Sequence, residues 1–302
     1  MKLTYLPDAE PRPRRVAIGT FDGVHLGHRE VIAGADTVVT FDPHPQSVVA
    51  PGTEPRLLTT LDRKAELVGA LGVDELVVIP FDGAFAARSA EDFITHVLVE
   101  RLQATHVSVG ENFRFGHKAQ GDAAMLAADG RFEARVVPLL EVDGEVVSSS
   151  HIRGLLLGGA VHYADELLGA PFAVDGEVVH GDKRGRTLGY PTANLVPQPG
   201  FVVPGHGVYA CRVRIAAPGG SDAADVEWIP AATNVGVRPQ FVTGRGELIE
   251  AYLIDWSGDL YGQRIRVEFL RRLRGERRFE SVEALVEQMG RDVEAARAPA
   301  GG

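Results

Sequence analysis

The chain of 302 residues is 45% hydrophobic and 24% charged, as is typical of a globular protein with room for two domains. A formal net charge of −10 argues against a general binder of nucleic acids or anionic membranes, because both select basic surfaces. The one cysteine, Cys211, cannot form an internal disulfide, as expected in a reducing compartment. The N-terminal segment lacks the apolar core of a signal peptide, and no run is long enough to span a bilayer, so we expect a cytoplasmic protein.

Residues 1–168 alternate strand-like and helix-like segments. The expected strands are Arg15–Ile18, Thr37–Phe41, Glu75–Ile79, Thr105–Val109 and Ala134–Val137. Helical patterns lie near Asp62–Leu71 and at Ala90–Leu102, the second opened by Ser89 as a helix cap. This alternation indicates a parallel sheet with crossover helices, in which ligands bind beyond the carboxyl ends of the strands.

The stretch Gly19–His28 joins an apolar strand to the start of a helix. Unpaired N–H groups at a helix N-terminus favour anions. Gly19 allows backbone angles closed to other residues, and Gly27 lets a phosphate approach the main chain. Because His25 and His28 add hydrogen-bond donors, we interpret the stretch as a nucleotide triphosphate site. Two alternatives remain: an ordinary strand–glycine–helix junction, and a metal site, although no His-Glu-x-x-His pattern is present.

Three later turns also follow strand-like runs and carry polar residues: Asp42–Pro45, Gly110–Asp122 and Ser148–Arg153. Ser149 and Ser150 precede an apolar helix, so they are either helix caps or phosphate contacts supported by the charge of Arg153. Asn112 belongs either to a plain loop with one buried ring or to the same site. At this stage the residues leave both interpretations open.

Together, these blocks resemble a known family. The string Gly19–His28 resembles the His-x-Gly-His signature of the nucleotidyltransferase superfamily, in the form seen in prokaryotic bifunctional riboflavin kinase/FMN adenylyltransferases (FAD synthetases). The three turns resemble, in order, the Thr-Phe-x-Pro-His-Pro, Gly-x-Asn-Phe-Arg-Phe-Gly and Ile-Ser-Ser-Thr-x-Ile-Arg blocks of that family. The resemblance implies catalytic roles for His25, His28 and Arg153. It also implies nucleotide contacts at Gly19, Phe21, Gly27, Asn112, Ser149 and Ser150.

Beyond Gly169-Ala170-Pro171 the alternation of strand-like and helix-like segments ends. Short strand-like runs now follow one another between glycine and proline turns: Ala173–Val179, Val208–Ile215, Val226–Thr233, Leu248–Ile254 and Ile265–Phe269. This spacing predicts an antiparallel β-barrel. A final helix is expected over Ser281–Arg297, with an apolar face formed by Val282, Leu285, Val286, Met289 and Val293.

Two parts of the expected barrel carry chemistry. The segment Gly181–Asn194 combines glycines with cations, and it is either a phosphate loop without the Walker A pattern or a hairpin turn. Glu250 lies in a strand whose alternation points Leu248, Glu250 and Tyr252 to one side. By default such a glutamate is a surface carboxylate.

The string Gly-Arg-x-Leu-Gly-Tyr-Pro-Thr-Ala-Asn in this loop resembles the riboflavin kinase signature. The resemblance implies that Thr192 and Asn194 help to hold a Mg²⁺–nucleotide and that Glu250 is the base for the flavin hydroxyl. It implies further nucleotide contacts at Gly181, Lys183, Gly185, Arg186, Gly189 and Pro191. Additional family blocks follow in the same order at Gly207–Tyr209, Asn234–Pro239 and Asp259–Gly262.

The resemblance implies an α/β nucleotidyltransferase domain with a Rossmann-like parallel sheet at 1–168. An antiparallel β-barrel riboflavin kinase domain with a C-terminal helix follows at 169–302. We therefore expect an enzyme that makes FMN from riboflavin and ATP and then FAD from FMN and a second ATP, with Mg²⁺ as cofactor. No nucleic-acid or membrane partner is expected, because the basic run Arg271–Arg278 is short and interrupted by Glu276, as on a solvated face.

Two other functions are considered. The first is a riboflavin kinase with a weakened or inactive first domain, suggested by the short segment Arg29–Asp36 after the histidines and by His151, where the family often has arginine. The second is a flavin-binding module without turnover. Glu250 and the Pro-Thr-Ala-Asn string argue against it, because binding alone does not need a base beside a Mg²⁺–nucleotide site.

Overall fold

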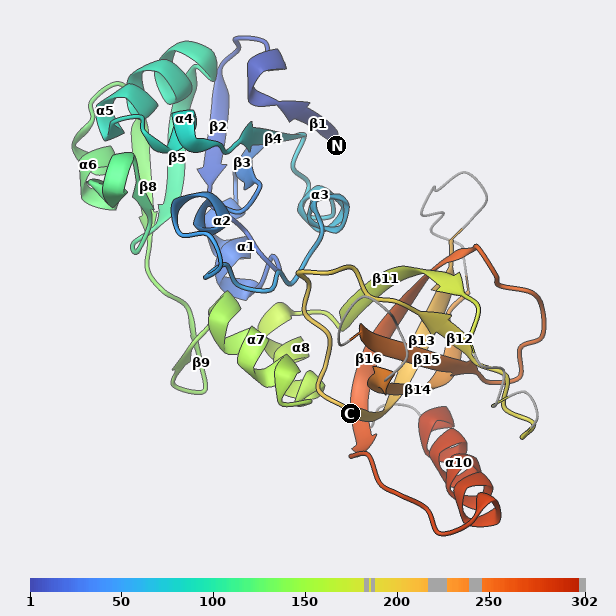
Figure 1. The fold of residues 1–302 in the computed structure, drawn as a ribbon. Coiled ribbons are helices and arrows are strands. Elements are labelled where there is room, and N and C mark those ends of the chain that lie inside the picture. Colours follow the sequence, from blue (N-terminus) through green and yellow to red (C-terminus); the bar gives the residue numbers. More distant parts are fainter. Residues whose placement is uncertain (182–184, 186–187, 217–226, 239–245, 299–302) are drawn as a thin grey trace. The chain divides into compact units, whose positions relative to one another are not determined.

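The computed structural model describes residues 1–181, 185, 188–216, 227–238 and 246–298. The chain divides into two compact units, Met1–His151 and Ile152–Gly302. The first contains a parallel sheet with helices on both faces, and the second contains a closed barrel (Figure 1).

The sheet of the first unit has six strands in the order β1-β4-β3-β2-β5-β8, and all its neighbours run parallel. The strands are β1 Lys2–Tyr5, β2 Arg14–Ile18, β3 Thr37–Asp42, β4 Glu75–Pro80, β5 Ala104–Gly110 and β8 Glu133–Val137. The predicted strands β2, β3, β4, β5 and β8 are confirmed. Strand β1 escaped prediction because its four residues form a mostly exposed edge strand beside β4.

The helices of this unit are short. They are α1 Leu26–Ile32, α2 Pro45–Val49, α3 Leu61–Gly69, α4 Gly83–Ala86, α5 Ala90–Asp92 and α6 Ala123–Ala128. The chain continues from α5 with π-type hydrogen bonds over Phe93–Arg101. Ser89 caps α5 as predicted, because its side chain accepts the N–H of Asp92 at 3.0 Å. Two small hairpins, β6 Arg114–Phe115 with β7 Gly121–Asp122 and β9 Glu141–Val142 with β10 Glu145–Val146, lie in the loops.

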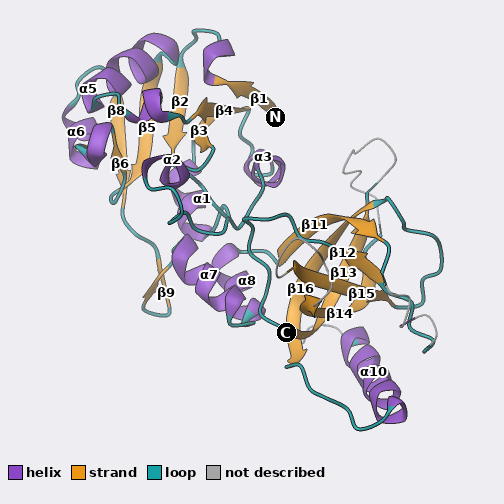
Figure 2. Cartoon of the chain, in the orientation of Figure 1, coloured by secondary structure: helices purple, strands orange, loops and turns teal. Residues whose placement is uncertain are grey.

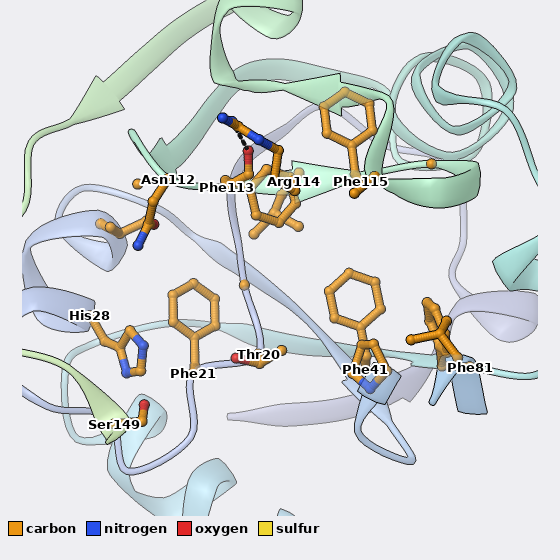
Figure 3. A pocket seen from close by; sticks show the side chains of 18 of the residues that line it. Thr20, Phe21, His28, Phe41, Phe81, Asn112, Phe113, Arg114, Phe115 and Ser149 are labelled. Atoms are coloured by element: carbon orange, nitrogen blue, oxygen red, sulfur yellow. Dashed lines mark hydrogen bonds between the residues drawn. The ribbon is translucent and has the colours of Figure 1, made fainter. Parts of the chain in front are cut away.

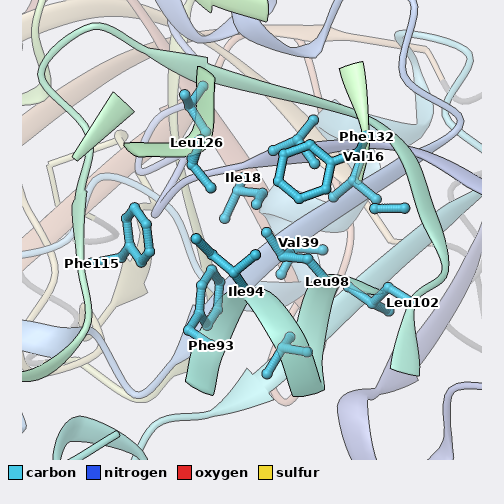
Figure 4. Packing of buried hydrophobic residues seen from close by; sticks show 14 of the residues in the cluster. Val16, Ile18, Val39, Phe93, Ile94, Leu98, Leu102, Phe115, Leu126 and Phe132 are labelled. Atoms are coloured by element: carbon cyan, nitrogen blue, oxygen red, sulfur yellow. The ribbon is translucent and has the colours of Figure 1, made fainter. Parts of the chain in front are cut away.

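Alternation along the strands builds a core on each face of the sheet. Val16, Ile18 and Val39 pack on one face against the helix 93–101, as Figure 4 shows. Ala17 and Val38, their neighbours in sequence, belong to the opposite core with residues of α1 and α3. Burial on both faces is the usual state of a parallel sheet, and it leaves the carboxyl ends of the strands as the place for chemistry.

The second unit contains a closed barrel of antiparallel strands in the order β11-β12-β15-β14-β13-β16 (Figure 2). The strands are β11 Phe172–Val179, β12 Ala193–Leu195, β13 Gly207–Ile215, β14 Ile229–Arg238, β15 Gly246–Leu253 and β16 Arg264–Arg274. The helices are α7 Ser149–Leu157, which begins at the end of the first unit, α8 Val161–Leu168 and α10 Val282–Arg297. The predicted barrel and final helix are therefore confirmed. The boundary at 168/169 stays a prediction; α8 packs on β11 and β16 within the second unit.

The contacts of α10 follow the expected apolar face except at its N-terminal end. Val282 is 56% exposed, whereas Val293 and Ala296 are buried, so the C-terminal half of the helix makes the closer contact with the barrel. In the basic run, Arg274 on β16 pairs with Asp292 on α10 at 2.7 Å. The guanidinium of Arg274 is therefore paired inside the unit, so the basic run Arg271–Arg278 is not entirely the solvated face that the sequence suggested.

Candidate active sites

The Gly19–His28 stretch forms the turn between β2 and α1. Phe21 and Val24 have positive φ angles of 46° and 44°, a conformation that costs energy unless the surroundings hold it. The carboxylate of Asp22 supplies part of that support, since its Oδ1 accepts the N–H groups of Leu58 at 2.8 Å and Thr59 at 3.2 Å. The loop is therefore held in one shape by the segment that precedes α3.

His25 caps α1 and directs His28. The Nδ1 atom of His25 accepts the backbone N–H of His28 at 3.2 Å, so neutral His25 carries its proton on Nε2. The two imidazole rings stack with centroids 3.5 Å apart, and Phe21 meets the His28 ring edge-on at 5.3 Å. Burial, and then the charges of His25 and Lys64, hold the pKa of His28 well below its usual range. Among the described residues, the buried Nδ1 of His28 has no hydrogen-bond partner.

The two predicted glycines of this turn have different surroundings. A Cβ on Gly19 would lie 3.0 Å from the ring of Phe21, so glycine is what allows that ring to fold over the end of β2. A Cβ on Gly27 would lie 3.4 Å from the ring of His25, an ordinary contact. Gly27 therefore keeps the space beside the histidine open without being sterically required there.

These residues line a cavity of about 1030 Å³ at the carboxyl end of the sheet. Gly19, Phe21, His25, Gly27 and His28 line it from the first turn, and Asn112, Ser149 and Ser150 line it from two others. Figure 3 shows His28, Asn112 and Ser149 at one end of the pocket and Phe41 and Phe81 at the other. The cavity thus has a polar end and an aromatic end.

Ser149 and Ser150 are the first two residues of α7, so neither occupies the cap position that the sequence offered as one interpretation. Ser148 caps α7, since its Oγ accepts the N–H of His151 at 3.2 Å. The hydroxyl of Ser149 donates to the carbonyl of Asp22 at 2.9 Å and so joins α7 to the histidine turn. Arg153 lies one turn further along α7, at the start of the second unit, and is not among the described residues that line the cavity.

Sequence reasoning missed most of the aromatic end of the cavity. Rings contact one another in a chain whose centroids are 5.3 to 6.2 Å apart, and its members are Phe41, Phe81, Phe85, Phe93, Phe115 and Phe113. A usable signal existed: Phe41 is the last residue but one of β3 and Phe81 directly follows β4, so both lie where parallel strands place ligand-binding residues. The others come from loops and helices with no common spacing.

In the barrel, Glu250 lies beside the predicted nucleotide residues. Strand β15 pairs with β12 so that Glu250 is directly opposite Asn194, and directly opposite residues project to the same face. Glu250 is half-buried, whereas Asn194 is 5% exposed. The Asn194 Nδ2 donates to the carbonyl of Thr192 at 3.2 Å, which directs its amide oxygen the other way. The structure therefore brings Thr192, Asn194 and Glu250 together.

Gly181 and Gly185 of the predicted loop are packed closely, whereas Gly189 has open space around it. A Cβ on Gly181 would lie 2.6 Å from Nδ2 of Asn194, a distance that no side chain can adopt. The carbonyl of Gly185 accepts the N–H groups of Leu188 at 3.0 Å and Tyr190 at 2.8 Å. Gly189 has a φ of +86°, as a tight turn before Pro191 requires. Lys183 and Arg186 lie outside the described residues.

Oxygen donors dominate the barrel site. Mg²⁺ prefers hard oxygen ligands and keeps phosphate oxygens and waters in its shell. The hydroxyl of Thr192 and the amide oxygen of Asn194 are donors of that kind, and they therefore fit a Mg²⁺–nucleotide. Across the described ranges, no group of three or more His, Cys, Asp or Glu side chains is placed to hold a metal without such a ligand.

The fold and these two sites define a class of protein: a two-domain transferase with an α/β half and a barrel half. Each half of the chain matches the model of one known protein family. Residues 8–151 match the family model for FAD synthetase, and residues 168–299 match that for riboflavin kinase. The chain belongs to the family of bifunctional riboflavin kinase/FMN adenylyltransferases.

Relatives with that name are similar over nearly their whole length. Identity is 35% to the protein of Listeria monocytogenes (94% of this chain, 91% of the relative) and 36% to that of Bacillus subtilis (92% and 89%). It is 37% to the protein of Escherichia coli K12, over 93% of this chain and 91% of the relative.

A crystal structure described as that of a macrolide-efflux protein from Streptococcus pneumoniae has the same fold. It is 30% identical, with a TM-score of 0.87 over 98% of this chain and 99% of the other. The description concerns the Streptococcus protein. In the part of this chain that the structure describes, no helix combines the length and apolar character needed to cross a bilayer.

Proposed function

We propose that this protein phosphorylates riboflavin to FMN with ATP and then transfers the adenylyl group of a second ATP to FMN, giving FAD and pyrophosphate. The observation that carries the proposal is the presence of both family domains in one chain, in the order found in the bifunctional relatives. The two activities then use separate sites, one at the end of the sheet and one on the barrel.

In the kinase reaction, Glu250 is the general base. Its carboxylate takes the proton of the terminal hydroxyl of riboflavin while that oxygen bonds to the γ-phosphorus of ATP and the bond to ADP breaks. Thr192 and Asn194 bind and orient the nucleotide through their oxygen atoms. When bound with ATP, Mg²⁺ supplies charge neutralisation at the phosphates. The register that places Glu250 opposite Asn194 supports this division of roles.

In the adenylyl transfer, no protein nucleophile is needed. An oxygen of the FMN phosphate bonds to the α-phosphorus of ATP, and the bond to pyrophosphate breaks. Developing charge on these oxygens is met by N–H groups at the start of α1, by Nε2 of His25 and by the imidazole of His28. Ser149 and Ser150, which line the cavity, are proposed to bind the same phosphates, and the role of Arg153 stays an expectation from the family resemblance.

The shape and polarity of the cavity are consistent with two substrates. Its volume of about 1030 Å³ is at the upper limit of usual single-ligand pockets. Phosphates belong at the polar end, with His28 and Asn112, and a planar ring system belongs against the aromatic end. On this arrangement the reacting phosphates of FMN and ATP meet beside the histidines.

The alternative of a kinase with an inactive first domain has less support. The segment after His28 is short, yet His28, Gly27, Asn112 and Ser149 still line one cavity. His151 is engaged with Glu145, its Nε2 lying 3.1 Å from the carboxylate, and does not itself define the phosphate end. Because α1 is short, it provides less packing on the outer side of the unit. Its first turn, which borders the cavity, is nevertheless in place.

Incubation with riboflavin, ATP and Mg²⁺, followed by chromatographic separation of the flavins, tests the function. FAD is the expected product, and it should also form from supplied FMN and ATP. FMN alone would favour the kinase-only alternative, and unchanged riboflavin would favour a binding module. Omitting Mg²⁺ and adding a chelator should abolish FMN formation. The cytoplasmic location stays a prediction.

A further inference from the structure

Lys64 is an unusual residue for the interior of the first unit. It lies on α3 and is 8% exposed, although lysine is almost never buried without a specific partner. Its Nζ donates to the carbonyl of Thr20 at 2.7 Å and to Oγ1 of Thr40 at 3.2 Å. The same Thr40 hydroxyl donates to the Thr20 carbonyl at 3.0 Å, so the ammonium closes a small buried network.

This network holds the beginning of the histidine turn. Thr20 lies between Gly19 and Phe21, and all three line the cavity. The carbonyl of Thr20 is therefore fixed from α3, through Lys64, and from β3, through Thr40. The turn has backbone strain at Phe21, so it needs external contacts of this kind to persist.

The charge of Lys64 is costly where it lies. Burial lowers the pKa of Lys64, and the carboxylates of Asp22 and Asp42 oppose that change. A buried ion is seldom the most stable solution, because an apolar side chain of similar size is often equally good. The position thus points to a role in the site beyond packing.

We propose that Lys64 is a positioning residue for adenylyl transfer: its ammonium group holds the Thr20 carbonyl in place and supplies a fixed positive charge behind His28 and the phosphate end of the cavity. The inference rests on the proposed function of that cavity. The charges that act on the pKa of His28 are those of His25 at the cap of α1 and Lys64 on α3, and those of Asp22 in the turn and Asp42 at the end of β3 act on the pKa of Lys64.

Two consequences follow for the chemistry. The charge of Lys64 favours the neutral form of His28, which still has one ring N–H to donate to a phosphate oxygen. It also attracts the negative charge that ATP and FMN bring together. Because the charge sits behind the turn, it acts without occupying space in the cavity.

The test uses the full chain and compares Lys64→Met, Lys64→Arg and Thr40→Val. We expect Lys64→Met to lower kcat/KM for FAD formation from FMN about 30-fold and to move the acidic limb of its pH profile to higher pH. Lys64→Arg, which keeps the charge, should recover a large part of the activity. Thr40→Val should reduce the rate of FAD formation without moving the acidic limb of the pH profile. It removes one hydrogen bond to the Thr20 carbonyl but leaves the charge of Lys64 in place.

FMN formation from riboflavin in the same preparations is the internal reference and should not change. If Lys64→Met does not fold, Lys64→Gln, which keeps a donor for Thr20 without the charge, carries the same comparison. Equal losses in the Met and Arg variants, or an unmoved pH limb in folded Lys64→Met, would overturn the proposal. Absence of FAD formation by the wild-type chain would instead contradict the function itself.

Discussion

Glu250 on β15 stands directly opposite Asn194 on β12 in the antiparallel barrel. Glu250 is half-buried and Asn194 is 5% exposed. The backbone of Gly181 packs against the side-chain amide of Asn194. A carboxylate and the end of the proposed nucleotide-binding loop therefore lie on neighbouring strands of the barrel. Phosphoryl transfer to an alcohol requires a base and a phosphate to meet at one hydroxyl, and this neighbourhood is what supports the proposed roles of the two residues.

Glu250→Gln tests the proposed base. FMN formation should fall by about 10²- to 10⁴-fold, the usual contribution of a general base, while supplied FMN is still converted to FAD. Separate assays of the two steps check this. Glu287→Gln, at an exposed position on α10 whose side chain is 70% accessible, is the matched control. Loss of both activities in Glu250→Gln would remove the assignment.

His28→Ala tests the other site. Riboflavin should be converted to FMN at the normal rate, and FMN should accumulate because FAD formation falls about 100-fold. The reason is the loss of an imidazole whose ring stacks on His25 and borders the polar end of the cavity. His96→Ala, in the helix 93–101 with a side chain 53% exposed, controls for removal of a histidine. Undiminished FAD synthesis would exclude His28 from the mechanism.

Sequence patterns predicted most of the fold, because they report local burial. Strands β2 to β5 and β8 are apolar runs between turns, and the barrel strands are separated by glycine and proline. The edge strand β1, with one buried residue, Thr4, in four, gives no such pattern. At Val282 the sequence predicted burial that is absent. The helical spacing of α10 indicates which face is apolar, but it does not show how far along the helix the barrel surface extends.

Most residues of the candidate sites were predictable because they lie in strings that resemble the family's motifs. His25, His28 and the loop before Asn194 lie in continuous strings, so a resemblance could locate them. The pairing of Glu250 with Asn194 depends on strand register between distant segments, which no local pattern contains. Lys64 escaped notice for a related reason: in a helical pattern a lysine is typical of a surface, and only the packed structure reveals its burial.

Gly181→Ala should impair the kinase reaction alone. The new Cβ would lie 2.6 Å from Nδ2 of Asn194, so the amide or the loop must shift by a substantial part of an ångström. Displacement on this scale near the reacting groups costs up to about 100-fold in rate. Steady-state assays should show kcat/KM for ATP falling in FMN formation and unchanged in FAD formation.

Gly154→Ala is the control for Gly181→Ala, because a Cβ on Gly154 meets no atom within 4 Å. It should leave both activities unchanged. Wild-type kinase kinetics in Gly181→Ala would show that Asn194 does not depend on the close approach at this glycine.

Asp165 predicts how the stability of the second unit changes with pH. Its carboxyl on α8 accepts the N–H of Phe172 at 2.8 Å. Burial raises its pKa to about 8, with the Phe172 hydrogen bond opposing and the charge of Glu268 adding to the change. The folded protein therefore keeps a proton that the unfolded chain loses near pH 4. Stability should accordingly fall as pH rises from about 4 to 8 and level off above that.

Asp165→Asn should flatten this dependence, since the amide oxygen still accepts the Phe172 N–H and no ionisation remains. At pH 8 we expect the variant to be more stable by about 2 kcal/mol, a discounted share of the full shift. Urea unfolding of the full chain at pH 5 and pH 8 measures the difference. Glu287→Gln, on α10 with a side chain 70% exposed, does not act on Asp165 and should keep the wild-type slope. An equally steep slope in Asp165→Asn would mean that Asp165 is ionised in the folded protein and that another group sets the pH dependence.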